Sequence, residues 1–411
     1  MRSAAALAST CLLLAAVSLA ACGGKGAGSG RSSGRTTLTI YSSMPLQGPA
    51  QAQSEAVVDA EKLALAEVGG RVGRFTIRYV ALDDATAAAN GSDPGQTSAD
   101  ARKAAQDAST IAYLGEGRDG ASAVSIPLLN VAGILQVSPL DTAAGLTRRE
   151  GADKGEPERY YPSGKRTFAR VVPPDNVQAA AQVSYQTEQG CTTTFVVDDG
   201  GVFGTGLLRQ FTLAANAKGP AIVERARFVR GATDAKAVAR QVGSSRADCV
   251  LYAGAADDSA VGIFKAVHAS DRAVKLFAAS AVADTSFARA LPASVQRVTY
   301  LTSPELDTRL LPPAGQDFVS TYRRKFGKAP EPGAIFGYEA MKVTLQAIQN
   351  AGDRGNDPAA VVNAMFLIKD RDSPLGKYSI DENGDTTLSD YGAYRVENGR
   401  LVFDMLLKID A

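Results

Sequence analysis

Residues 38–82, LTIYSSMPLQGPAQAQSEAVVDAEKLALAEVGGRVGRFTIRYVAL, decide the fold of this chain. Residues 38–41 and 75–82 are short runs rich in β-branched and aromatic side chains, which predict two strands. Between them, residues 51–68 carry apolar side chains at helical spacing, and Gly69 and Gly70 end the expected helix. A strand, a helix and a second strand in this order predict a parallel βαβ unit.

The same alternation continues along the chain and indicates two α/β lobes, separated at Pro173 and Pro174. Before this break we expect strands at residues 110–114 and 135–137 and helices at 98–107 and 121–129. After it we expect strands at 193–197, 222–229, 249–252, 275–278 and 298–301, helices at 177–188, 205–217, 235–242, 260–269, 316–326 and 334–350, and a β-rich end at 377–380, 392–396 and 401–409. The prediction is an α/β protein with two doubly wound, Rossmann-like lobes. No repeat at the level of single residues relates the two halves.

The amino terminus predicts export. Arg2 precedes an apolar run that ends in small residues and Cys22, and this leader is too short to stay in a bilayer as a spanning helix. It resembles bacterial lipoprotein signals, which implies that residues 1–21 are removed and that lipid on Cys22 holds the protein at a membrane surface. The alternative is an ordinary secretory leader with free release. Residues 22–37, rich in Gly and Ser, predict a flexible tether.

The composition is that of a globular protein, with 45% hydrophobic and 21% charged residues. The net charge of +1 argues against a basic groove for nucleic acid. After the leader, no apolar run approaches the roughly 20 residues that cross a membrane as a helix.

Two of the four cysteines, Cys191 and Cys249, lie outside the leader, and His268 is the only histidine. The chain therefore has too few cysteine and histidine residues for a zinc site, or for a cysteine or serine nucleophile paired with histidine. Cys191 precedes one expected strand and Cys249 opens another, so adjacent parallel strands would bring both sulfurs to the same end. In an oxidising compartment this favours a disulfide. The alternative is two separately buried thiols.

Several short motifs occur in an order and at spacings that resemble the type I periplasmic binding proteins. They are residues 41–48 (YSSMPLQG), 80–84 (VALDD), 138–142 (SPLDT), 168–173 (FARVVP), 196–199 (VVDD) and 337–340 (GYEA). The nearest resemblance is to the leucine/isoleucine/valine-binding lipoproteins of branched-chain amino-acid ABC transporters. It implies two hinged lobes that close on a ligand held between them, with no cofactor.

The resemblance also implies three chain crossings between the lobes, which we place near Val172, Pro304 and Leu375. The amino-terminal lobe would comprise residues 38–172 with 305–375, and the carboxy-terminal lobe residues 173–304 with 376–411. Ligands of such folds bind at the carboxyl ends of the strands.

The family's binding positions can be carried onto this chain. Thr142 matches the threonine that holds a ligand carboxylate, Asp119 falls where relatives have a serine, and Ser280 falls where they have an acid for the ammonium group. Phe203 matches an aromatic that caps the ligand, and Ala255 takes another aromatic position. The predicted ligand site comprises Asp119, Gly120, Leu140, Asp141, Thr142, Phe203, Ala255 and Ser280.

These departures predict a ligand other than a standard branched-chain amino acid. Asp119 would repel an α-carboxylate at close range. Asp119 and Asp141 together suggest a cationic or hydroxyl-rich ligand. The alternative is that Asp119 pairs with Arg118 or caps the following helix.

Two other motifs match known ligand-binding patterns only in part. Gly115-x-Gly117-x-x-Gly120 matches a dinucleotide fingerprint but follows the third strand instead of the first, so we predict no cofactor. Residues 381–385 (DENGD) lack the spacing of a calcium loop and its distal Glu, which favours a hairpin turn and no metal.

We therefore predict a monomeric solute-binding protein that delivers a small polar molecule, an amino acid or a similar compound, to an ABC transporter permease. It would not be an enzyme, because the chain offers no nucleophile with its base and no metal cluster. The alternative is a sensory module of the same fold that presents its ligand to a membrane receptor.

Overall fold

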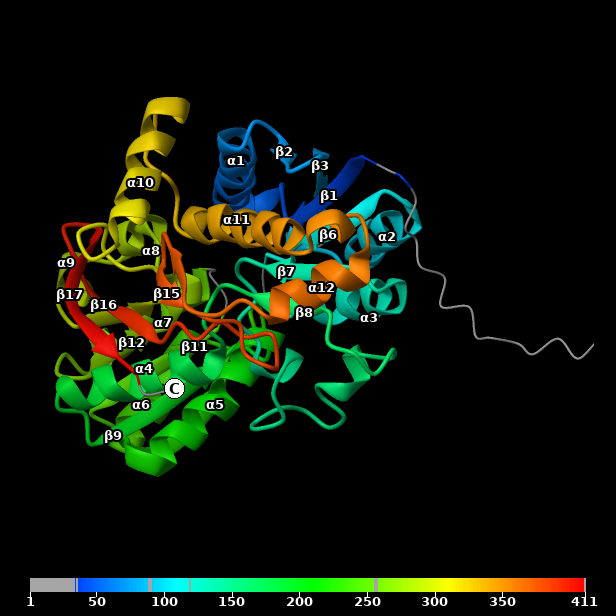
Figure 1. Cartoon of the computed structure of the whole chain (residues 1–411). Coiled ribbons are helices and arrows are strands. Elements are labelled where there is room, and N and C mark those ends of the chain that lie inside the picture. Colours follow the sequence, from blue (N-terminus) through cyan, green and yellow to red (C-terminus); the bar gives the residue numbers. More distant parts are fainter. Residues whose placement is uncertain (1–33, 35, 88–90, 118–119, 255–257, 410–411) are drawn as a thin grey trace, which may run out of the picture. The chain divides into compact units, whose positions relative to one another are not determined.

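Two β-sheets organise the chain (Figure 1). The computed structural model describes residue 34 and residues 36–87, 91–117, 120–254 and 258–409. The predicted signal peptide, Cys22 and residues 22–33 of the predicted tether lie outside these ranges. Thr37, the last residue of that tether, is the first residue of strand β1.

The first sheet has six strands in the order β2-β3-β1-β6-β7-β8. Only β2 runs antiparallel to its neighbour. In chain order the strands are β1 (Thr37–Met44), β2 (Arg71–Val72), β3 (Phe75–Asp83), β6 (Thr110–Leu114), β7 (Leu135–Ser138) and β8 (Phe168–Arg170).

Both faces of this sheet are covered by helices, which is why its strands are apolar on both sides. Ile40 and Ala112 pack in one core with helices α1 (Gln51–Glu67), α10 (Pro313–Phe326), α11 (Ala334–Asn350) and α12 (Pro358–Phe366). Tyr41 and Tyr113, one residue further along their strands, pack on the opposite face with α2 (Pro94–Gln106) and α3 (Ser122–Ala132). This alternation follows from the two-residue period of a strand.

The second sheet has seven strands in the order β10-β9-β11-β12-β13-β16-β17, of which the last two are antiparallel. Helices cover both of its faces, so the predicted doubly wound two-lobe architecture is confirmed. The strands are β9 (Thr193–Asp198), β10 (Ala221–Arg227), β11 (Cys249–Ala253), β12 (Lys275–Ala278), β13 (Thr299–Ser303), β16 (Asp390–Glu397) and β17 (Arg400–Lys408). The helices are α4 (Asp175–Glu188), α5 (Val202–Lys218), α6 (Ala235–Ser245), α7 (Asp258–Ser270), α8 (Thr285–Ala290) and α9 (Ala293–Gln296).

The chain passes between the two sheets three times. The first crossing follows β8, and the second leads from β13 to α10. The third comes later than the predicted position near Leu375, because Tyr378 and Ile380 are still buried in the core around α11. The hairpin of β14 (Arg371–Ser373) and β15 (Gly376–Tyr378) thus stays with the first lobe. We place the third crossing between Leu388, which packs against that core, and the start of β16.

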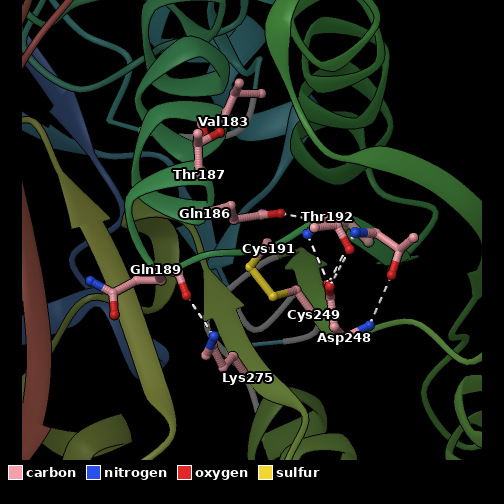
Figure 2. Close-up of a disulfide and its surroundings, with 11 residues drawn as sticks. Val183, Gln186, Thr187, Gln189, Cys191, Thr192, Asp248, Cys249 and Lys275 are labelled. Carbon is pink, nitrogen blue, oxygen red and sulfur yellow. Dashed lines mark hydrogen bonds between the residues drawn. A yellow bond between two sulfur atoms is a disulfide. The ribbon is translucent and has the colours of Figure 1, made fainter.

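Cys191 and Cys249 form a disulfide, as the sequence predicts (Figure 2). Strands β9 and β11 are parallel neighbours, and the two Cα atoms at their amino ends are 5.9 Å apart. The Asp248 carboxylate lies beside the sulfurs and accepts hydrogen bonds from the backbone and hydroxyl of Thr192. Bonded sulfur atoms offer no thiolate to a metal, so the role of this group is structural.

Two turns lie in the carboxy-terminal part of the chain, and the sequence predicts the one at residues 381–385. Asn398 and Gly399 have φ angles of 51° and 69° and join β16 to β17 in a hairpin, as their residue types demand. Residues 381–385 close on themselves through the Asp381 carboxylate, which accepts the backbone N–H groups of Asn383 and Asp385. Ile380 and Thr386 flank this turn as an antiparallel bridge.

Candidate functional site

The carboxyl ends of the central strands of the first sheet meet at one edge. Register places Ser42 of β1 beside Leu114 of β6, and Leu114 beside Val137 of β7. The loops that follow these strands therefore lie next to one another. One of them is the loop at residues 138–142, which carries three of the eight residues of the predicted ligand site.

Buried hydrogen bonds fix this loop. The Ser138 hydroxyl donates to the carbonyl oxygen of Glu116 at 2.8 Å and accepts the N–H of Asp141 at 2.8 Å. The Asp141 carboxylate is fully buried and accepts backbone N–H groups of Gly120 and Ser122 at 3.2 and 3.1 Å. Both of its oxygens thus hold the start of α3. The prediction that Asp141 helps to attract a cationic ligand gains no support from these contacts, because its charge is already used by the fold.

Thr142 lies where this loop meets the second lobe. Its carbonyl oxygen accepts the N–H of Asp175, the first residue of α4, at 2.8 Å. Leu140, two residues earlier, faces the start of α11, and a methyl group on Gly333 would lie 3.1 Å from its Cδ2 atom. Thr142 and Leu140 thus connect the loop to α4 and to α11.

Gly120 brings the loop after β6 against the second lobe. It has a φ of 72°, and a methyl group on it would lie 2.6 Å from Cγ1 of Val202, the first residue of α5. Glycine is required here both by the backbone angle and by this approach. Asp119 and Ala255, two further predicted site residues, lie outside the described residues.

The remaining predicted residues belong to the second lobe. Phe203 is 7% exposed, and its ring packs with Leu207 and Phe211 in the core beneath α5. Most of its surface is therefore used for packing, and its role as a cap on the ligand stays a prediction. Ser280 is half-buried, and its backbone N–H donates to the side-chain oxygen of Gln178 at 2.8 Å.

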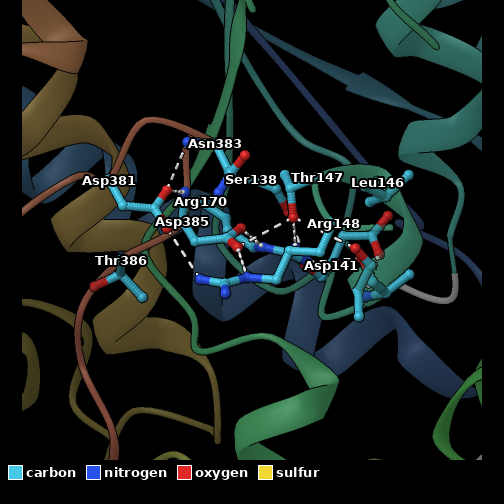
Figure 3. A network of polar contacts seen from close by, with 12 residues as sticks. Ser138, Asp141, Leu146, Thr147, Arg148, Arg170, Asp381, Asn383, Asp385 and Thr386 are labelled. Atoms are coloured by element: carbon cyan, nitrogen blue, oxygen red, sulfur yellow. Dashed lines mark hydrogen bonds and ion pairs between the residues drawn. The ribbon is translucent and has the colours of Figure 1, made fainter. Parts of the chain in front are cut away.

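A buried ion-pair network behind this loop was not predicted (Figure 3). Arg170, at the end of β8, is fully buried, and its Nε lies 2.7 Å from Oδ1 of Asp385. Its guanidinium also donates to the carbonyl oxygens of Asp141 and Ala143 at 3.1 and 2.9 Å. Arg170 thus links the predicted ligand loop to the segment that leads into the third crossing.

Asp385 also forms an ion pair with a second cation, Arg148. The Nε of Arg148 lies 2.6 Å from its Oδ2, and Arg148 also pairs with Asp381 at 3.0 Å. Burial acts to raise the pKa of Asp385, but Arg170 and Arg148 hold that pKa below its usual range. Because the two oxygens of Asp385 meet two guanidinium groups, this carboxylate stays charged.

A cavity of about 200 Å³ lies where the three crossings converge. It is lined by Pro173 of the first crossing, Pro304 and Glu305 of the second, and Leu388 close to the third, with Phe336 of α11 on another side. Burial raises the pKa of Glu305 to about 7, and its Oε2 accepts the backbone N–H of Gly333 at 2.6 Å. Residues from all three crossings border this space, so its shape depends on the hinge.

Two more buried acids lie at the same edge of the first sheet. Burial raises the pKa of Asp84 to about 6, and burial together with repulsion from Asp84 raises that of Glu116. Tyr113 donates to Glu116 at 2.8 Å. Within the described residues, this edge offers buried carboxyl groups and backbone groups but no nucleophile with its base. Such an arrangement suits binding by hydrogen bonds and charge, without covalent chemistry.

A family profile described as periplasmic binding protein matches residues 38–400. The chain belongs to the periplasmic binding protein family. It is 25% identical to the Leu/Ile/Val-binding protein BraC3 of Rhizobium johnstonii over 372 residues, which are 89% of this chain and 93% of that protein.

Solved structures share the fold of this periplasmic binding protein. A leucine-binding protein LivK from Thermotoga maritima has a TM-score of 0.76 at 21% identity, covering 90% of this chain and 99% of that one. A solute-binding protein of an ABC transporter from Rhodopseudomonas palustris BisB5, solved with 3,4-dihydroxybenzoic acid, has a TM-score of 0.73 at 18% identity, covering 91% and 98%.

Family membership settles the general role. Periplasmic binding proteins are extracytoplasmic solute-binding proteins, not enzymes, and they work with ABC transporter permeases. Among the described residues, no helix combines the length and the apolar character that crossing a membrane requires.

Proposed function

We propose that this periplasmic binding protein is the lipid-anchored substrate-binding component of an ABC importer. It captures a small polar molecule, an amino acid or a similar compound, by hinged closure of its two lobes. The observation that carries the proposal is the junction of the lobes at Thr142. There a loop fixed at the carboxyl edge of the first sheet meets the first residue of α4 through a backbone hydrogen bond of 2.8 Å. Ligands of open α/β sheets bind at this edge.

The names of related proteins and the compounds bound in related structures support an amino acid or a similar small acid as the ligand. BraC3 carries the name of a Leu/Ile/Val-binding protein, and a LivJ protein from Streptococcus pneumoniae was solved with isoleucine. Other structures of this fold hold benzoate or hydroxybenzoates. Because Ser280 replaces the acid that we assign to the ammonium group of branched-chain ligands, and Asp119 replaces a serine, we expect a ligand other than leucine, isoleucine or valine.

Ligand screening tests this function directly. A ligand that binds the native state alone raises the melting temperature, by an amount that grows with its concentration over Kd. We expect at least one compound from a panel of amino acids, polyamines, amides and aromatic acids to do so, and X-ray scattering to show a smaller radius of gyration when it is added. If no compound in the panel shifts melting or scattering, the proposed function is wrong.

The anchor is tested separately. Cells that express the chain are grown with an alkyne-bearing fatty acid, and the purified protein is assayed for the label. We expect the wild-type protein to carry it and Cys22→Ser to lose both the label and membrane association. A soluble, unlabelled wild-type protein would contradict the lipoprotein assignment without affecting ligand binding.

A further inference from the structure

Asp175 stands at the junction of the two lobes. It is the first residue of α4, directly after Pro173 and Pro174 of the first crossing. Its backbone N–H donates to the carbonyl oxygen of Thr142 at 2.8 Å. The resemblance assigns Thr142 to the ligand, so Asp175 places an acidic residue beside a predicted ligand contact. The resemblance locates the acid for the ammonium group at the position of Ser280 instead.

The carboxylate of Asp175 is buried but only partly bonded. The residue is 1% exposed, and Oδ1 accepts the amide of Gln178 at 3.0 Å. Oδ2 has no hydrogen-bond partner among the described residues. Burial raises the pKa of Asp175 to about 7, while the Thr142 hydroxyl and Arg170 act in the opposite direction. Buried polar atoms are almost always bonded, so Oδ2, which has only the Thr142 hydroxyl close by in the described part of the chain, has capacity to accept a water or a ligand group.

The charged groups around Asp175 are already engaged. Arg170 is the nearby cation, but its donors go to Asp385, to Thr147 and to the carbonyl oxygens of the predicted ligand loop. The Asp141 carboxylate holds backbone N–H groups. The groups that act on Asp175 are the side chains of Thr142, Arg170, Asp141 and Gln178, and its own charge in turn acts on Tyr391. The Tyr391 hydroxyl has no partner among the described residues either.

The free oxygen faces a position that carries no side chain. Gly206 lies in the first turns of α5, and a methyl group built on it would lie 3.9 Å from Oδ2 of Asp175, an ordinary contact distance. Within the described residues, no other atom outside that helix approaches this position within 4 Å. The space beside Oδ2 on this side therefore has room for at least a methyl-sized group.

We propose that Oδ2 of Asp175 accepts an ammonium group of the ligand, next to the hydroxyl of Thr142. This inference rests on the proposed function and narrows it to solutes with a protonated amine, such as amino acids and small amines. Asp175, at the start of α4, then provides the acidic group that relatives carry at the position of Ser280. A carboxylate paired with an ammonium group gains a charge-assisted hydrogen bond that no neutral analogue can offer.

Calorimetry with matched ligands tests the assignment. The probes are L-leucine, L-ornithine, 4-aminobutyrate and putrescine, each beside the analogue that lacks one amino group. We expect at least one amine to bind the wild-type protein at least 100-fold more tightly than its analogue. Asp175→Asn, which keeps the shape of the side chain, should weaken that amine about 100-fold and the analogue less than 3-fold. Asp372→Asn, a change at a highly exposed acid, should alter neither affinity.

Three outcomes would overturn the assignment. Asp175→Asn could leave the amine affinity intact, the wild-type protein could bind an analogue as tightly as its amine, or the ligand could be a carboxylate without an amine, such as benzoate. In these cases the hydrogen-bond partner of Oδ2 is a buried water and not the ligand, and the proposed function of solute binding still holds. If none of these probes and no compound of the broader screening panel binds, the proposed function fails together with this inference.

The pH dependence of binding provides a readout that needs no variant. Between about pH 5 and 7 the amine should bind about tenfold more tightly per pH unit, because Asp175 must lose its proton to pair with an ammonium group. The affinity should level off above pH 7, and that of the analogue should stay flat throughout. A wild-type amine affinity that does not change over this range would contradict the proposal even if Asp175→Asn failed to fold.

Discussion

Asp385 and Asp175 are two buried carboxylates that both interact with the charge of Arg170, and they differ in how many hydrogen-bond partners the protein gives them. Asp385 meets Arg170 with one oxygen and Arg148 with the other, and its pKa is held below the usual range. Asp175 bonds to Gln178 with one oxygen, leaves the other without a partner, and has its pKa raised to about 7.

The contrast shows that burial alone does not reveal what an acidic residue does. A carboxylate with a full set of donors holds the fold together, and here it ties the end of β8 to the segment before the third crossing. A carboxylate with a free oxygen at a lobe junction costs stability until something pairs with it. Evolution tolerates such a cost at binding sites more readily than elsewhere.

The largest expected effect is the loss of the complete pair. Asp385→Asn leaves Arg170 charged and buried without its counter-ion, so we expect the free energy of unfolding to fall by about 3–5 kcal/mol. Guanidinium chloride denaturation measures this. The matched control is Asp372→Asn, which removes an exposed pair with Lys377 and should change stability by less than about 0.5 kcal/mol. Equal effects for the two variants would mean that the buried network contributes nothing special.

Asp175→Asn should have the opposite sign. A carboxyl group whose pKa rises from 3.8 to about 7 on folding destabilises the native state at pH 8, with an upper limit of about 4 kcal/mol. We therefore expect this variant to be more stable than the wild-type protein by roughly 2–4 kcal/mol at pH 8, in denaturation without ligand. A clear loss of stability would place Asp175 with Asp385 among the structural acids.

The sequence was sufficient for the features that depend on local pattern and strand order. Residues 38–41 predict a strand, and they lie in β1, where Ile40 and Tyr41 pack in different cores. The doubly wound order predicts that β9 and β11 are neighbours, which favours the disulfide between Cys191 and Cys249 that the structure contains. Helix α12 was not predicted, although the sequence carries a helix-start signal there. Asp357 caps the start of the helix and Pro358 takes its first position.

Features that depend on contacts distant in sequence could not be predicted. Arg170 and Asp385 are 215 positions apart, and no local pattern connects them. The segment around Tyr378 has a strand pattern, but such a pattern does not specify which core it joins, and the third crossing was placed too early for that reason. Phe203 matched the family in residue type and Asp141 lies inside the matched motif at residues 138–142, whereas the direction of each side chain follows from its packing.

The two acids should also respond to pH in opposite ways. Asp175 has a raised pKa in the folded state, so the advantage of Asp175→Asn should be complete above pH 7 and vanish as the pH falls toward 4. Asp385 has a lowered pKa, so the deficit of Asp385→Asn should persist down to about pH 4 and shrink only below it. Urea unfolding of the three proteins from pH 3 to 8 measures both trends. Parallel curves for all three proteins would refute this distinction between the acids.

A glycine adjoins each acid, and the two glycines sharpen the same comparison. Gly384 precedes Asp385 with a φ of 94°, and a methyl group on it would lie 2.1 Å from the carbonyl oxygen of Phe168. We expect Gly384→Ala to lower the free energy of unfolding by about 2–3 kcal/mol, because the backbone on both sides must move. Thermal and chemical denaturation would show this, and an unchanged midpoint would mean that the turn is free to shift.

Gly206→Ala should have the smallest effect on stability and a separate effect on binding. Its methyl group would lie 3.9 Å from Oδ2 of Asp175 with no backbone clash, and alanine is the better helix former, so the free energy of unfolding should rise by about 0.5–1 kcal/mol. The same methyl group would narrow the approach to the free carboxylate oxygen and weaken an amine ligand. A variant that gains stability and keeps full affinity would show that the ligand does not enter beside Asp175.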